Sequence, residues 1–108
     1  MEANLKTEED FKNQVLDSPI PVIVDYGAEF CGPCKILAPI LHELLEGKAD
    51  KIKLVTVDIS ECEDELTTGH EIEDIPVLLL FFKGEEKSRS VHPKREDVEA
   101  MIETALKL

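Results

Sequence analysis

Residues 22–41 read "VIVDYGAEFCGPCKILAPIL", and this stretch decides the fold. Its first five residues are rich in β-branched and aromatic side chains, which is typical of a strand over 22–26. After Gly32-Pro33, apolar residues recur at the spacing of one wide helix face. That face comprises Ile36, Leu37, Ile40, Leu41, Leu44 and Leu45. The stretch therefore predicts a strand that leads into a helix, with the helix beginning directly after Cys31.

The rest of the chain alternates between helical and strand patterns. The other expected elements are a helix capped by Thr7, a strand at 53–58, a partly helical acidic segment, a buried strand at 76–82, a polar strand after Lys83-Gly84 and a helix from about Lys94. This order predicts an α/β fold in which helices cover both faces of a mixed sheet. Only "MEANL" precedes the first helix, so an N-terminal strand is expected to be short or absent. We expect one domain over residues 1–108.

Composition restricts the class of partner. Acidic residues outnumber basic ones 24 to 12, which gives a net charge of −12. Nucleic acid and anionic membranes both require positive patches, so neither is an expected partner.

The longest apolar run, Val77–Phe82, is far shorter than the roughly 20 residues of a membrane span. The polar, acidic start lacks the features of a secretory signal, so we expect a cytoplasmic protein. No sizeable exposed apolar stretch is evident, and a monomer is expected.

Three cysteines are present, at positions 31, 34 and 62. An odd count does not suit a disulfide scaffold. The pair Cys31–Cys34 could be a redox couple, half of a zinc site or two inert thiols. A zinc site would need Cys62 and one of the histidines at 42, 70 or 92, and no second close pair of ligands exists. We expect no metal and no cofactor, and little reactivity of Cys62 between its two glutamates.

The spacing of the cysteine pair suits a bond that forms and breaks. With Cys31 at the N-cap and Cys34 three residues on, the two Cβ atoms lie near the roughly 5–6 Å of helix neighbours, and a small adjustment reaches the distance that a disulfide needs. Unpaired N–H groups and the helix dipole favour a thiolate at a helix N-terminus. Cys31 is therefore the expected nucleophile, and Cys34, expected to lie deeper, the resolving thiol. Gly32 permits close approach of a substrate backbone, and Pro33 suits the helix start.

The quoted stretch, followed by "DIPVLLLFFKGE" at 74–85, resembles the thioredoxin family. The similarity runs from about residue 11 to the end. It implies the thioredoxin fold and a thiol–disulfide oxidoreductase that reduces protein disulfides and is re-reduced by a thioredoxin reductase. Two alternatives stay open: an oxidase or isomerase with the same fold, and a binding module in which the thiols are secondary.

The resemblance also assigns roles outside the cysteine motif. Asp25 matches the buried carboxylate of the family, which would hold its proton tightly and exchange it with Cys34; an exposed aspartate at a strand end is the alternative. Pro76 matches the cis-proline beside the active site. The lysine that faces the carboxylate in the family is matched by Leu54, unless a one-residue slip restores Lys53.

Several positions depart from the family pattern. Gly27 and Phe30 stand where large aromatic residues are usual. Asp74 places a charge before Ile75-Pro76, and His92-Pro93 replaces a glycine-containing turn that normally lines the substrate groove. The residues expected to shape the site are Phe30, Gly32, Pro33, Asp74, Ile75, Pro76 and His92. Together these changes predict narrower or shifted partner choice with the chemistry intact.

Overall fold

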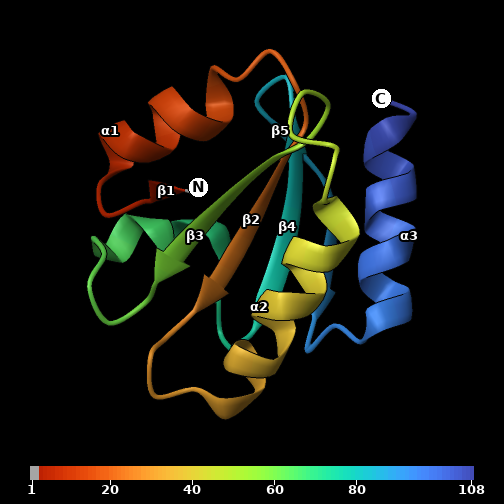
Figure 1. The fold of residues 1–108 in the computed structure, drawn as a ribbon. Coiled ribbons are helices and arrows are strands. Elements are labelled where there is room, and N and C mark those ends of the chain that lie inside the picture. Colours follow the sequence, from red (N-terminus) through yellow and green to blue (C-terminus); the bar gives the residue numbers. More distant parts are fainter. Residues whose placement is uncertain (1–2) are drawn as a thin grey trace.

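The computed structural model describes residues 3–108 and contains a five-stranded mixed sheet in the order β1-β3-β2-β4-β5 (Figure 1). The strands are β1 (Ala3–Asn4), β2 (Val22–Gly27), β3 (Lys53–Asp58), β4 (Val77–Phe82) and β5 (Glu85–Val91). β1, β3 and β2 run parallel, whereas β4 is antiparallel to both β2 and β5. This is the expected α/β thioredoxin fold, with an N-terminal strand of only two residues.

Helices cover both faces of the sheet. They are α1 (Glu8–Phe11), which continues as a π-helical turn (Lys12–Leu16), α2 (Gly32–Leu45), two 3-10 turns (Asp64–Leu66 and Thr68–His70) and α3 (Arg95–Leu106). Thr7 caps α1, as the sequence predicts, and forms a capping box with Asp10. The acidic segment is partly helical, also as predicted.

Two apolar clusters hold these layers together. Phe11 and Val15 pack with alternate residues of β2, β3 and β4 on one face. On the other face, Leu37 and Leu41 of α2 pack with the buried side of α3. The first five residues of β4 are buried because both faces of this strand are covered. The apolar composition of the segment therefore follows from its central place in the sheet.

The predicted helix faces are wider than the buried ones. Ile36 belongs to the predicted apolar face but is 68% exposed, so the prediction is wrong at this position. Successive helix residues are rotated by about 100°. Ile36 therefore turns away from the sheet when its neighbour Leu37 is buried. Periodicity marks a broad stripe, but only packing selects which edge of the stripe is covered.

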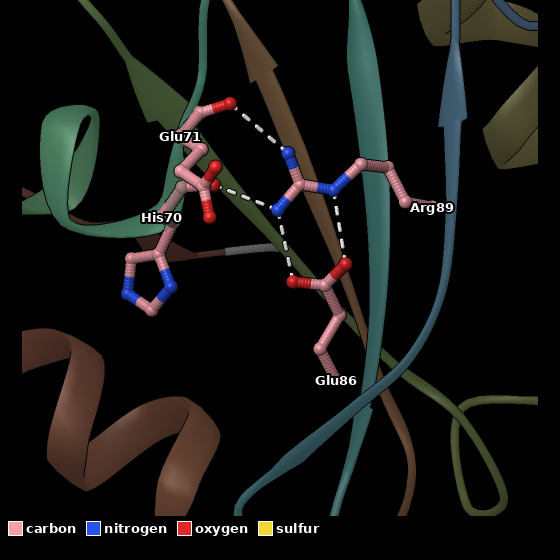
Figure 2. A network of polar contacts seen from close by, with 4 residues as sticks. All are labelled: His70, Glu71, Glu86 and Arg89. Atoms are coloured by element: carbon pink, nitrogen blue, oxygen red, sulfur yellow. Dashed lines mark hydrogen bonds and ion pairs between the residues drawn. The ribbon is translucent and has the colours of Figure 1, made fainter.

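Arg89 of β5 ties the irregular segment before β4 to the sheet (Figure 2). Its guanidinium donates to the backbone oxygens of His70, at 2.7 Å, and Glu71, at 3.0 Å. It also forms two hydrogen bonds of 2.9 Å with the carboxylate of Glu86. Glu71 adopts a left-handed φ of 55°, which turns its carbonyl toward Arg89. One side chain thus fixes the course of the chain that leads to residues 74–76.

Replacing Arg89 with alanine should lower the free energy of unfolding by about 1–2 kcal/mol, because two backbone carbonyls lose a charged donor. Lys87→Ala is the matched control, since Lys87 forms an exposed ion pair with Glu85 on the same strand, and its replacement should cost less than about 0.5 kcal/mol. Urea unfolding followed by circular dichroism measures both. Equal losses for the two variants would contradict this role of Arg89.

Candidate active site

The junction between β2 and α2 brings the cysteine pair together. Cys31 is the N-cap of α2, with extended backbone angles, and its Sγ accepts a hydrogen bond from the Cys34 N–H at 3.3 Å. Cys31 and Cys34 form a disulfide, with their Cα atoms 5.3 Å apart. Pro33 lies in the first turn of the helix, where its missing N–H leaves no intrahelical bond unmade. The structure therefore confirms that the helix begins directly after Cys31.

The relative depth of the two sulfur-bearing residues differs from expectation. Cys31 is only 8% exposed, whereas Cys34 is partly exposed, so the prediction that Cys34 lies deeper is wrong. The physical reason is Gly27 at the end of β2. A Cβ atom at that position would lie 3.1 Å from the Cys34 Sγ. Because residue 27 is glycine, it places no side chain over this sulfur, a consequence that the sequence pattern does not reveal.

Asp25 and Cys34 line the same pocket, which has a volume of about 360 Å³. Asp25 lies in β2 and is partly buried, directly opposite Thr56 of β3 and Leu78 of β4. The carboxylate is therefore not the exposed strand-end group that the sequence left as an alternative. Its position within the sheet brings it to the pocket that Cys34 also lines.

The residue expected opposite Asp25 was wrongly identified. Leu54 pairs with Ile23, and Thr56 is the residue that pairs with Asp25. A slip does not restore the lysine either, because alternate residues of a strand point to opposite faces. Lys53 lies on the other face, where its Nζ donates to the Gln14 backbone oxygen at 3.0 Å. The sequence pattern does not reveal Thr56, which the strand register identifies.

The turn before β4 and the turn after β5 are tied to one another. The Ile75–Pro76 peptide bond is cis, as the resemblance implies. The Pro76 carbonyl accepts a hydrogen bond from the His92 N–H at 2.8 Å. The His92 Nε2 lies 3.2 Å from a carboxylate oxygen of Asp74, whose other oxygen accepts from the Ile75 N–H at 3.0 Å. His92 holds a left-handed φ of 50°, which a glycine would adopt more easily.

These two turns lie at the same end of the sheet as the cysteine pair. Val77, next to Pro76, pairs with Tyr26 near the end of β2 and with Val91 at the end of β5. Phe30, just before Cys31, is 75% exposed, and Val91 is 55% exposed. The active-site end therefore combines exposed apolar side chains with the Asp74–His92 pair.

Cys62 lies half-buried in the irregular segment between β3 and β4. Burial raises the pKa of its thiol, and the nearby carboxylates of Asp58, Asp64 and Glu63 raise it further. The direction agrees with the low reactivity that the sequence predicts. Within residues 3–108, no group of three or more His, Cys, Asp or Glu side chains is arranged to hold a metal ion. No helix in that range is long and apolar enough to cross a membrane.

Comparison with known proteins identifies the family. The sequence profile described as Thioredoxin matches residues 2–104. The chain belongs to the thioredoxin family. It is 45% identical to Thioredoxin C-2 of Corynebacterium nephridii over 85 residues, which cover 79% of this chain and 78% of that one. It is 41% identical to the thioredoxin of Rickettsia prowazekii (strain Madrid E) over 88 residues, 82% and 83% of the two chains.

Membership of the thioredoxin family and the adjacent cysteine pair together establish the activity. The protein is a thiol–disulfide oxidoreductase that reduces protein disulfides. Its partners are, in general terms, proteins that carry disulfides and a reductase that restores the dithiol.

The raised pKa of Cys62 predicts slow alkylation of this thioredoxin in its oxidised form. At pH 8 a smaller share of the thiol is ionised than in the unfolded chain, so iodoacetamide should label Cys62 at least about threefold more slowly in the folded protein. The same protein in urea is the control, with the Cys31–Cys34 disulfide intact in both samples. Labelling that is faster in the folded protein would contradict the direction of the shift.

Proposed function

We propose that Cys31 is the attacking thiol of the reductase and Cys34 the resolving thiol. The Cys31 thiolate attacks one sulfur of a substrate disulfide and expels the other as a thiolate. Cys34 then attacks the Cys31 Sγ, which releases the second substrate thiol and leaves the Cys31–Cys34 disulfide. The position of Cys31 at the N-cap of α2, where its Sγ accepts the Cys34 N–H, supports this order because it stabilises negative charge on that sulfur.

Asp25 serves in this proposal as the proton acceptor and donor for Cys34. Both residues line one pocket, so a proton can pass between carboxylate and thiol directly or through water. When Cys34 attacks, Asp25 takes its proton, and when the dithiol is restored the proton returns.

The docking surface in this proposal consists of Phe30, Gly32, Pro33, Asp74, Ile75, Pro76 and His92. Phe30 offers an exposed ring beside Cys31 for apolar contact. Asp74 and His92 add a carboxylate and an imidazole, 3.2 Å apart, beside the cis-proline, where the family usually has a glycine-containing turn that lines the substrate groove. We expect these groups to narrow or shift the choice of partners, and to favour partners with basic residues near their disulfides.

The setting that fits this activity is a reducing compartment. We propose that residues 1–108 act as a single thioredoxin-like domain, as a monomer in the cytoplasm, with electrons delivered by a thioredoxin reductase. The odd number of cysteines supports a compartment in which thiols are not locked into structural disulfides.

Replacing either cysteine tests the assignment of roles. With dithiothreitol as the electron source, Cys31→Ser should no longer catalyse the reduction of insulin. The catalysed rate should fall at least about 1,000-fold, because the attacking thiol is absent. Cys34→Ser should stop turnover but leave a mixed disulfide on Cys31. Cys62→Ser is the control and should retain full activity. Activity that survives in Cys31→Ser would mean that the protein acts by docking alone.

Charge at Asp74 should set a preference among substrates. At low salt, peptides whose disulfide is flanked by lysine should be reduced about tenfold faster than peptides flanked by glutamate. Asp74→Asn should reduce this ratio by several-fold, whereas Glu9→Gln, an equal loss of charge at an exposed position of α1, should change it little. Equal ratios in the two variants would remove Asp74 from the docking surface.

A further inference from the structure

The pocket beside the cysteine pair opens on Cys34 and not on Cys31. Its walls come from the end of β2, the first turns of α2 and the end of β3. Among the residues that line its volume of about 360 Å³ are Asp25, Gly27, Cys34, Ala38 and Thr56, and Cys31 is not one of them. A molecule in this pocket would therefore meet Cys34 and not its disulfide partner.

Gly27 keeps this approach open. The place that a Cβ atom of residue 27 would occupy is 3.1 Å from the Cys34 Sγ and 3.3 Å from its Cβ. A side chain there would crowd the sulfur on the pocket side. With glycine, Cys34 is partly exposed although Cys31, the attacking cysteine, is only 8% exposed.

The chemistry of the disulfide favours attack at Cys34 once that sulfur can be reached. In thiol–disulfide exchange the thiol that ionises more readily leaves faster. Attack on Cys34 expels Cys31, whose Sγ sits at the N-cap of α2 and accepts the Cys34 N–H. Attack on Cys31 would instead expel the Cys34 thiolate, which does not sit at the helix N-cap and is therefore the poorer leaving group. The leaving-group preference and the open pocket therefore point to the same sulfur.

The charges around the pocket select the attacking molecule. Among the described residues that line it, Lys35 alone carries an ammonium group, whereas four carry carboxyl groups: Asp25, Glu29, Asp58 and Glu61. Its volume of about 360 Å³ suits a small molecule. A short chain that carries an amine satisfies both conditions, whereas a molecule rich in carboxylates is repelled.

We propose that this pocket is an entry site for small aminothiols, which reduce the oxidised protein by attacking Cys34. The aminothiol thiolate forms a bond to the Cys34 Sγ, the Cys31–Cys34 bond breaks, and Cys31 leaves as a thiolate. A second aminothiol then attacks the aminothiol sulfur of the mixed disulfide, which releases the aminothiol disulfide and the Cys34 thiolate. Two thiols are oxidised and one protein disulfide is reduced. This route rests on the proposed function, since it regenerates the dithiol of the same couple.

Single-cysteine variants isolate the sulfur that the pocket serves. Cys31→Ser with Cys62→Ser leaves only Cys34, and Cys34→Ser with Cys62→Ser leaves only Cys31. Each is mixed with cystamine, whose exchange with Cys34 forms the same mixed disulfide as the proposed route, and with the anionic disulfide 3,3′-dithiodipropionate. Mass spectrometry gives the rate of adduct formation over a range of pH. Serine is a good N-cap, so the first variant should keep the start of α2.

The expected result is that Cys34 forms the cystamine adduct. For each cysteine, the rate of adduct formation with cystamine is divided by the rate with the anionic probe. This ratio should be about tenfold larger for Cys34 than for Cys31. The net charge of −12 should favour the cationic probe at any cysteine, and the comparison with Cys31 removes this general effect. About 1 M salt should abolish most of the difference. A Cys34 that stays unmodified while Cys31 reacts, or equal ratios at the two cysteines, would overturn the proposal.

Closing the pocket supplies the second test. Ala38 lines it one helical turn beyond Cys34, so Ala38→Leu should slow adduct formation at Cys34 at least about fivefold relative to Cys31 in the matching background. Ala100→Leu on the exposed side of α3 is the matched control and should leave that ratio unchanged. An unchanged ratio in Ala38→Leu would overturn the route. Insulin reduction by the wild-type protein is a separate readout, so failure of the pocket and failure of the reductase role are distinguishable.

Discussion

The hydrogen bond from the Cys34 N–H to the Cys31 Sγ is the interaction on which the function of this thioredoxin depends. It exists because β2 ends at Gly27 and α2 begins at Gly32, which leaves Cys31 as the N-cap. Helix N-termini stabilise negative charge, so the same geometry favours Cys31 both as the attacking sulfur and as the leaving one. The sheet holds this junction rigid, because β2 is paired on both sides and buried under two helical layers.

The surroundings of the pair differ from the family pattern in two separate ways. On one side, the turns at residues 74–76 and 91–93 are joined by the Asp74–His92 pair and by the His92 N–H bond to Pro76. On the other side, the absence of a side chain at Gly27 uncovers Cys34. The first difference concerns large partners that dock across Cys31, and the second concerns small molecules that enter beside Cys34. One redox couple can therefore meet two kinds of reaction partner from two directions.

Local pattern was enough to predict the order of the elements, the start of α2 at Cys31 and the family. These features depend on periodicity, on caps such as Thr7 and on the "CGPC" motif, all of which lie within a few residues. Three predictions failed because they depend on contacts across the sheet. Ile36 is exposed because packing uses only part of its helix face, and Thr56, not Leu54, pairs with Asp25 because of strand register. Cys34 is accessible because of a neighbour on another element, which spacing alone does not reveal.

Capture of a protein disulfide at low pH tests most directly whether the helix start activates Cys31. Insulin is mixed with Cys34→Ser and, separately, with Cys31→Ser, and the mixed disulfides are quantified after acid quenching. At pH 6, well below the value of about 8.5 at which a free thiol ionises, Cys34→Ser should still capture insulin within minutes, whereas Cys31→Ser should capture almost none. Equal capture by the two variants, or capture by Cys34→Ser that disappears at pH 6 as it would for an ordinary thiol, would contradict the assignment of Cys31.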